Sequence, residues 1–314
     1  MRIAVFGSGA VGGYFGGRLA QAGQEVHLIA RGDHLSAIRD HGLRVTSPKG
    51  DFVVRPATAT DEPATVGAVD VILLGVKAWQ VPQAAEAMRP LIGPGSVIVP
   101  LQNGIEVPDQ LVAPFGADHV MGGLCRIIAY VAAPGHIRHA GGEPYIAFGE
   151  LDGPTSRRAE ALRQAFGTAR GVTAEIAPDI RASMWSKFLF IAAVSGVGAL
   201  TRAPIGVIRS QPESRRLLRQ AMEEVFRVAL ASRVALPADS VDRALAFADS
   251  LPPDGTASMQ RDIIEGRPSE LDAQVGAVVR LADRLGVEAP VHRLTYAALA
   301  PLERRARGTL QFTI

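Results

Sequence analysis

The chain begins Met1-Arg2-Ile3-Ala4-Val5-Phe6-Gly7-Ser8-Gly9-Ala10-Val11-Gly12, an apolar run followed by glycines at G-x-G-x-x-G spacing. A small-residue pattern typical of a helix follows, from residue 13 to residue 22. A buried strand before this motif and a helix after it are the context in which it binds the pyrophosphate of a dinucleotide. Helix N–H groups then face the phosphates, and the alternative is a glycine-rich turn that binds nothing. We therefore expect the cofactor to be bound by Gly7, Ser8, Gly9, Ala10, Val11 and Gly12.

The end of the second expected strand indicates which dinucleotide is bound. This strand, residues 25–30, ends at Arg31-Gly32-Asp33. An NAD site of this type carries an acid at this point for the ribose 2′-hydroxyl, whereas arginine suits the 2′-phosphate of NADP(H). Arg31 therefore predicts NADP(H). Two alternatives stay open: Asp33 binds a ribose hydroxyl, or Arg31 is only a solvated loop charge.

Composition excludes several classes of protein. The 314 residues suffice for two domains, and 47% hydrophobic with 20% charged residues describes a globular chain. A net charge of +2 makes no case for nucleic acid, and the single cysteine, Cys125, excludes a disulfide framework and a cysteine-based metal site. We expect no metal. The longest apolar run, residues 188–200, is too short to span a bilayer and predicts a buried helix, and no signal peptide is visible. A cytoplasmic protein without a membrane partner is expected.

The first half alternates strands and helices. Residues 69–76 and 96–101 read as buried parallel strands, and Lys77 and Asn103 stand just after their carboxyl ends. Ligands of open α/β sheets bind outside these ends, so Gly9, Arg31, Lys77 and Asn103 are all expected at one crevice.

Strands with Pro-Gly and Gly-Gly turns are predicted over residues 120–148, where we expect them to extend the same sheet. Helical periodicity dominates afterwards, for example over residues 217–230 and 271–285, the latter ending at Gly286. The fold class predicted is α/β: an N-terminal Rossmann-type doubly wound sheet, residues 1–178, followed by an all-helical C-terminal domain, residues 179–314.

Lysine is rare in this chain. Of 33 basic residues only Lys49, Lys77 and Lys187 are lysines. A lysine retained against an arginine background suggests a place where a compact, titratable ammonium is needed. Lys49 lies in an obvious turn, whereas Lys77 and Lys187 do not.

Five motifs, in order along nearly the whole chain, resemble those of the ketopantoate reductases (2-dehydropantoate 2-reductases). They are Gly7–Gly12, Val76-Lys77-Ala78, Leu101-Gln102-Asn103-Gly104, Trp185-Ser186-Lys187-Phe188, and Ser258-Met259 followed by Glu270-Leu271-Asp272. The resemblance implies reduction of 2-dehydropantoate to pantoate with NADPH in the pantothenate pathway. It also implies a Rossmann domain followed by a helical domain, with the active site between them. A homodimer through the helical domain is plausible for such a fold.

Site residues follow from the resemblance one by one. Lys187 matches the catalytic lysine, a general acid that protonates the carbonyl oxygen as hydride reaches carbon. Glu270 matches the active-site glutamate, which holds the lysine or binds the substrate hydroxyl. Ser258 matches the serine that binds the substrate carboxylate, while Lys77 and Asn103 match residues at the nicotinamide ribose and the reacting substrate. The bland alternatives are a snorkelling lysine, a surface glutamate and a capping serine.

The chain departs from the family pattern four and eight residues after Lys187. Asparagines usual in the family are replaced by Ile191 and Ser195, which lie on the same helix face as Lys187. Ser195 can keep one hydrogen bond to substrate, but Ile191 cannot. The departures leave open the same chemistry on a different, more apolar 2-oxo acid. A sensor that binds NADP(H) without turnover is a separate alternative, against which the presence of Lys187 and Glu270 argues.

Overall fold

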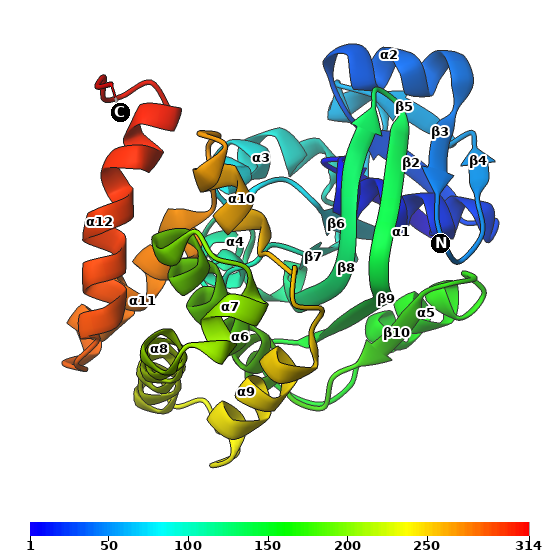
Figure 1. Cartoon of the computed structure of the whole chain (residues 1–314). Helices are drawn as coiled ribbons and strands as arrows, with labels where there is room; N and C mark the ends of the chain where they lie inside the picture. The colour runs from blue at the N-terminus through cyan, green and yellow to red at the C-terminus, as the bar shows by residue number, and fades with distance from the viewer. Residues whose placement is uncertain (314) are drawn as a thin grey trace. The chain divides into compact units, whose positions relative to one another are not determined.

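The computed structural model describes residues 1–313, which divide into two compact units. Unit 1 comprises residues 1–102 and 107–180, and unit 2 comprises residues 103–106 and the chain from residue 181 onward. The two units are built from different elements, as the ribbon shows (Figure 1). Unit 1 holds all of the described strands, and unit 2 is helical.

The first sheet of unit 1 is parallel and has the strand order β5-β2-β1-β6-β7. Its strands are β1 (Arg2–Phe6), β2 (Glu25–Ile29), β5 (Thr58–Thr60), β6 (Val71–Leu74) and β7 (Val97–Pro100). The helices of unit 1 are α1 (Ala10–Gln21), α2 (Gly32–His41), α3 (Val81–Met88), α4 (Val107–Phe115) and α5 (Arg157–Gly167), with 3-10 turns at Pro63–Thr65, Ala78–Gln80, Arg89–Leu91 and Ala117–His119.

Alternate residues of β1 face two different cores. Ile3 and Val5 pack in one cluster with Phe15 of α1, whereas Ala4 and Phe6 pack in another with Val81 of α3. Helices therefore cover both faces of the sheet, which explains why its strands are continuous apolar runs. The doubly wound N-terminal fold predicted from the sequence is confirmed.

The expectation that residues 120–148 extend this sheet is wrong. The long strands β8 (Met121–Ala133) and β9 (His136–Glu150) pair with each other and form a second sheet with β3 (Leu43–Thr46), β4 (Phe52–Val54) and β10 (Thr173–Ile176). Between β7 and β8 only one bridge, Ile98 to Val120, appears in the described chain. Because the N–H groups of Val97 and Leu101 bond toward β6, residue 100 faces the β8 side, and Pro100 has no N–H to donate there.

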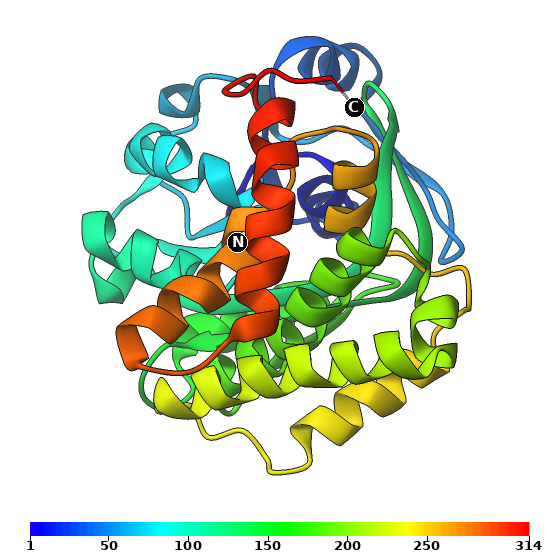
Figure 2. The ribbon, with the colours of Figure 1, turned by 60° about the vertical axis from the view of Figure 1, so that its left-hand side comes forward.

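Unit 2 is a helical bundle. Its helices are α6 (Ile180–Thr201), α7 (Ile205–Ser210), α8 (Pro212–Ala231), α9 (Ser240–Ser250), α10 (Ser258–Ile264), a π-turn (Asp272–Gly276), α11 (Ala277–Leu285) and α12 (Pro290–Ala306, red in Figure 2). One face of α8, with Leu218, Met222 and Val225, is buried in its core. Gly286 ends α11 in the left-handed conformation, as its sequence position predicts. The helical C-terminal fold is likewise confirmed.

Helix α6 is longer than its apolar run suggests. Its 22 residues are long and apolar enough to cross a membrane, but 67% of the most apolar window is buried inside the protein. This is what the core helix of a soluble protein shows. The prediction of a buried helix therefore stands, although the argument from length was wrong.

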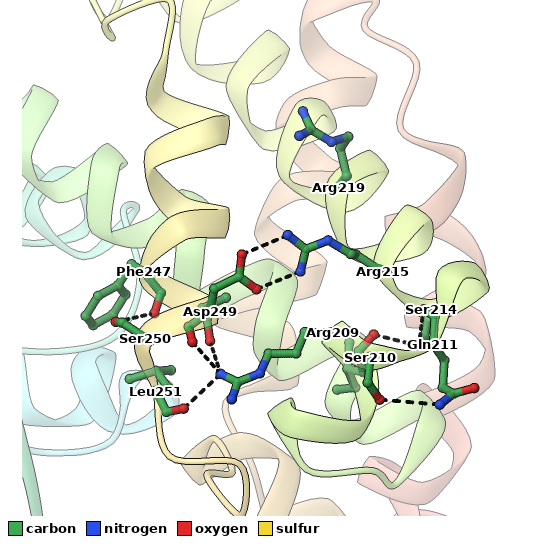
Figure 3. Close-up of polar contacts among 12 residues, drawn as sticks. Arg209, Ser210, Gln211, Ser214, Arg215, Arg219, Phe247, Asp249, Ser250 and Leu251 are labelled. Atoms are coloured by element: carbon green, nitrogen blue, oxygen red, sulfur yellow. Dashed lines mark hydrogen bonds and ion pairs between the residues drawn. The ribbon is translucent and has the colours of Figure 1, made fainter.

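An arginine joins α7 to the end of α9 (Figure 3). The Nη1 atom of Arg209 donates to the carbonyl oxygens of Ala248, Asp249 and Leu251, each at 2.8 Å. Arg215 of α8 forms a two-pronged ion pair with the Asp249 carboxylate, at 2.6 and 2.8 Å. Cationic side chains at a helix C-terminus satisfy its free carbonyl groups, so this cluster fixes three helices of the bundle.

Candidate functional site

The glycine loop of unit 1 requires two of its glycines sterically. Gly7 has a φ of +93°, and a Cβ on it would lie 2.7 Å from the amide nitrogen of Val76. A Cβ on Gly12 would lie 2.3 Å from the carbonyl oxygen of Gly7. At Gly9, in contrast, a Cβ would meet no atom within 4 Å. The loop is thus closed on the protein side and open beside Gly9, as close approach of a phosphate requires.

The start of α1 leaves its backbone donors available. Gly9 is the N-cap, no side chain caps the helix, and no acid stands in its first turn. Ser8 is 2% exposed, and its hydroxyl donates inward to the carbonyl oxygen of Ile29 at 3.1 Å. The backbone N–H of Ser8 also donates to that oxygen, at 3.1 Å, so the donors offered to an anion are those of the first turn of α1.

His34 links the glycine loop to the turn between β8 and β9. The sequence did not single out this residue. Its Nδ1 accepts from the amide of Gly135 at 3.1 Å, and its Nε2 lies 2.9 Å from the carbonyl oxygen of Ser8. Because Nδ1 accepts, Nε2 must carry the proton, so the ring is the neutral Nε2–H tautomer. A histidine in a polar stretch of sequence gives no signal of this role.

The end of β2, which carries Arg31, lies beside the glycine loop. The amides of Gly7 and Ser8 both bond to the carbonyl oxygen of Ile29, two residues before Arg31. Arg31 is the N-cap of α2, and its side chain and that of Asp33 are exposed. An exposed arginine at this strand end is the residue type that binds a ribose 2′-phosphate in sites of this kind.

Lys77 follows β6 on the other side of the loop. The amide of Gly75 donates to Phe6 at 2.8 Å, so the two strand ends stay together. Lys77 is exposed, and its ammonium lies 5.7 Å from the ring centre of Trp79. The Nε2 atom of Gln102 donates to the carbonyl oxygens of Leu74 and Val76, at 2.9 Å each, and so fixes the backbone that carries Lys77. This role of Gln102 was also missed.

In unit 2, Lys187 lies in the interior of α6. Its side chain is half-buried, as is that of Ile191 one turn later. Ser195, a further turn along, is fully buried, and its hydroxyl has no hydrogen-bond partner in residues 1–313. A buried hydroxyl without a partner is costly, so a water or a ligand group is expected to satisfy it.

Ser258 and Asn103 are half-buried. Ser258 is the first residue of α10 and Ala257 is its N-cap, so the capping role considered for the serine is wrong. Close helix contacts hold α10 and the π-turn on α6: a Cβ on Gly198 would meet Gln260, and one on Gly196 would meet Val275.

Glu270 is buried, 5% exposed, so the surface-glutamate alternative is wrong. Gln274, which is fully buried in the π-turn, lies with its Nε2 3.5 Å from Oε2 of Glu270. Its Oε1 has no hydrogen-bond partner in the described residues. Gln274 is a further residue that the sequence did not single out, although π-turns are frequent at functional sites.

Residues 1–313 contain no group of three or more His, Cys, Asp or Glu side chains placed to hold a metal ion. The polar groups available are therefore a lysine, a buried glutamate and neutral amides and hydroxyls. Such a set can donate a proton and bind a carboxylate or a hydroxyl.

Comparison with known proteins places the chain in a family. Residues 3–153 match the family model described as ketopantoate reductase PanE/ApbA, and residues 179–303 match the model of its C-terminal part. An uncharacterized oxidoreductase of Bacillus subtilis, YkpB, is 33% identical, covering 96% of this chain and 99% of its own. A 2-dehydropantoate 2-reductase of Mesorhizobium japonicum is 32% identical, covering 97% of each chain.

Solved structures of similar proteins have the same fold over nearly the whole chain. A PanE/ApbA family ketopantoate reductase from Ralstonia eutropha is 34% identical with a TM-score of 0.87, covering 98% of this chain and 100% of its own. A D-mandelate dehydrogenase with NADH, at 22% identity and a TM-score of 0.88 over 99% and 100% of the chains, shares the fold. With matches over both units, the chain belongs to the ketopantoate reductase family and is an oxidoreductase of that family.

Proposed function

We propose that this protein reduces a 2-oxo acid to a 2-hydroxy acid with NADPH, and that 2-dehydropantoate is its substrate. The observation that carries the proposal is the match to 2-dehydropantoate 2-reductases over 97% of the chain, together with a lysine in the interior of an apolar helix. Residues 1–178 then form the cofactor-binding domain and residues 179–314 the catalytic domain.

The glycine loop fits a dinucleotide. The open side of Gly9 and the uncapped start of α1 suit a pyrophosphate that lies against the loop of residues 7–12 and is held by the backbone N–H groups at the start of α1. Arg31 would bind the 2′-phosphate, and Lys77 and Asn103 the nicotinamide side of the cofactor. When bound, the reduced nicotinamide supplies the hydride that adds to the carbonyl carbon.

Lys187 supplies the proton. Hydride addition converts the carbonyl into an alkoxide, and transfer of a proton from Nζ of Lys187 to that oxygen completes the hydroxyl group. The ammonium also stabilises negative charge on this oxygen before the proton moves. Glu270, a buried carboxylate, holds the lysine in place or accepts from the substrate hydroxyl.

Substrate contacts are assigned to Ser258, Asn103 and Ser195. The Ser258 hydroxyl would bind the substrate carboxylate. Full burial of Ser195 and the apolar Ile191 favour a second candidate, a more apolar 2-oxo acid, because a site that loses a polar partner loses selectivity for the polar substrate. A sensor that binds NADP(H) without turnover has no use for a proton donor.

The experiment is steady-state NADPH oxidation, followed at the nicotinamide absorbance, with 2-dehydropantoate beside a panel of aliphatic and aromatic 2-oxo acids. We expect the highest kcat/KM with 2-dehydropantoate. Preference for an apolar acid would keep the chemistry and replace the substrate. Absence of turnover with every acid, while NADPH still binds, would contradict the proposed function and favour the sensor.

A further inference from the structure

The short segment Asn103–Glu106 belongs to unit 2, although it follows β7 in the chain. Ile105 packs against the apolar core of the helical bundle. Gly104 approaches the π-turn closely, since a Cβ on it would lie 3.3 Å from the carbonyl oxygen of Ala273. The backbone that carries Asn103 therefore rests against the turn that begins two residues after Glu270.

A single guanidinium joins the segment to the turn. Arg280 of α11 donates from Nη2 to Oε2 of Glu106 at 2.6 Å and to the carbonyl oxygen of Asp272 at 2.9 Å. Its Nη1 donates to Oδ1 of Asp272 at 3.2 Å. The hydroxyl of Tyr296 donates to the same Oδ1 at 2.7 Å, so the π-turn is held from two helices.

The positive charge of Arg280 is compensated by the carboxylates of Glu106 and Asp272. Burial alone would lower the pKa of Arg280, but its hydrogen bonds to Glu106 and Asp272 outweigh burial and raise the pKa. Burial and the bond to Asp272 raise the pKa of Tyr296, so its hydroxyl stays protonated as a donor. Arg284, the other cation near Glu106, is 3.7 Å away and 64% exposed, which leaves Arg280 as the close partner.

We propose that Arg280 and Glu106 are positioning residues that clamp the Asn103 segment to the π-turn and so fix Asn103 relative to Glu270. The inference rests on the proposed function, because it assigns Asn103 and Glu270 to the site. Partly exposed ion pairs contribute little to the free energy of unfolding, so we expect this pair to affect the position of the Asn103 segment more than the stability of the bundle. Lysine cannot replace Arg280, because one ammonium does not span Glu106 and two oxygens of Asp272 in the fixed fork of a guanidinium.

The test compares Arg280→Lys and Glu106→Gln with a control, Arg293→Gln, which removes an exposed arginine paired with Asp283 in the same bundle. We expect both clamp variants to lower kcat about tenfold, because small misplacements of positioned groups are costly in rate. The Kd of NADPH, the melting temperature and every property of the control are expected to stay near wild type.

Two further measurements show whether the clamp acts through Asn103. In an Asn103→Ala background, Arg280→Lys is expected to add little further loss of kcat, since residues that act as a unit are not additive. Hydrogen exchange of the peptide 270–276 is expected to speed up in Arg280→Lys but not in the control. The clamp is overturned if the losses of kcat caused by Asn103→Ala and Arg280→Lys are fully additive. It is also overturned if Arg280→Lys changes neither kcat nor the exchange of peptide 270–276.

Hydrogen exchange also tests the clamp independently of the proposed function, because it needs no assay of turnover. If wild type reduces no 2-oxo acid, the proposed function fails whatever exchange shows. Unchanged exchange of peptide 270–276 in both clamp variants then overturns the clamp on its own, without any assay of turnover. Faster exchange in both variants supports the structural half of the inference even then.

Discussion

Gln274 donates a hydrogen bond from Nε2 to Oε2 of Glu270, 3.5 Å away and four residues earlier, with both side chains almost fully buried. A buried carboxylate needs donors, because otherwise the cost of removing it from water is not recovered. The amide is a neutral donor, so it orients the carboxylate without neutralising it. Gln274 therefore acts on the orientation of Glu270 and not on its charge.

Replacing the amide tests this relationship. Gln274→Met keeps the length of the side chain and removes the donor, and we expect kcat to fall about tenfold, the equivalent of one charge-assisted hydrogen bond. The melting temperature is expected to change little, because the cost of removing the donor to Glu270 is offset by removing the unpartnered Oε1 as well. Gln220→Met, at an exposed position of α8, is the control. An unchanged kcat in Gln274→Met would separate Gln274 from the site.

Lys187→Ala tests the proton donor. Turnover of the 2-oxo acid is expected to fall by ~10²–10⁴, the usual contribution of a general acid, while NADPH affinity measured by fluorescence titration stays near normal. Lys49→Ala is the matched control, since the Lys49 ammonium pairs with Glu143 at 2.6 Å on the surface of unit 1. Equal activities of Lys187→Ala and wild type would remove Lys187 from the mechanism.

Arg31→Ala tests the choice of cofactor. The KM for NADPH is expected to rise about ten- to a hundredfold, as loss of a charged hydrogen-bond partner predicts, with little change for NADH. Arg39→Ala removes an arginine of the same helix that pairs with Asp61, and is expected to leave both cofactors unaffected. If Arg31→Ala weakens NADPH and NADH equally, the arginine does not recognise the 2′-phosphate.

The sequence predicted those parts of the structure that depend on local order. The glycine loop and the start of α1 are contiguous, and the reasons for Gly7 and Gly12 are short-range contacts. Helical periodicity likewise located α8 and α11. For such segments, spacing and residue size carry the information.

Long-range pairing was not predictable in the same way. β9 pairs with β3, which lies about ninety residues earlier and is only four residues long, so nothing local separates it from the first sheet. Gln274 and His34 were missed because their roles come from burial and from partners in other elements. The bond between Glu106 and Arg280 joins residues 174 positions apart. Local spacing and residue type hold no signal for such a pair.

Stability of unit 1 is expected to depend on pH through Glu150. Burial would raise the pKa of Glu150, but hydrogen bonds from Arg158, at 2.6 and 2.8 Å, and from Ser156 outweigh it and lower the pKa below the usual value of a glutamate. A carboxyl group with a lowered folded-state pKa stabilises the fold above its unfolded pKa, and this contribution is lost as the pH falls through the folded value.

Glu150→Gln measures that contribution. The variant is expected to be less stable at pH 7 by about 1 kcal/mol, a fall of a few degrees in melting temperature, because it loses a partly buried charged pair. The difference from wild type is expected to shrink at pH 4 and below. Glu160→Gln, which breaks an exposed pair with Arg163, is the control and is expected to show neither effect. A difference that stays constant with pH would mean that packing, not ionisation, is responsible.

Ile191→Asn tests which 2-oxo acid the site selects. Ile191 is half-buried one turn after Lys187, where the family usually has asparagine, so the variant restores a polar group at a position that can accommodate it. We expect kcat/KM for 2-dehydropantoate to rise relative to an apolar 2-oxo acid by about tenfold, the scale of one hydrogen bond to a substrate hydroxyl. Ile264→Asn, at a position that is 45% exposed on α10, controls for polarity alone. Ser195→Asn is a poorer test, because a larger side chain at a fully buried position also costs packing energy. If Ile191→Asn lowers kcat/KM for every acid equally, residue 191 packs the helix and does not select the substrate.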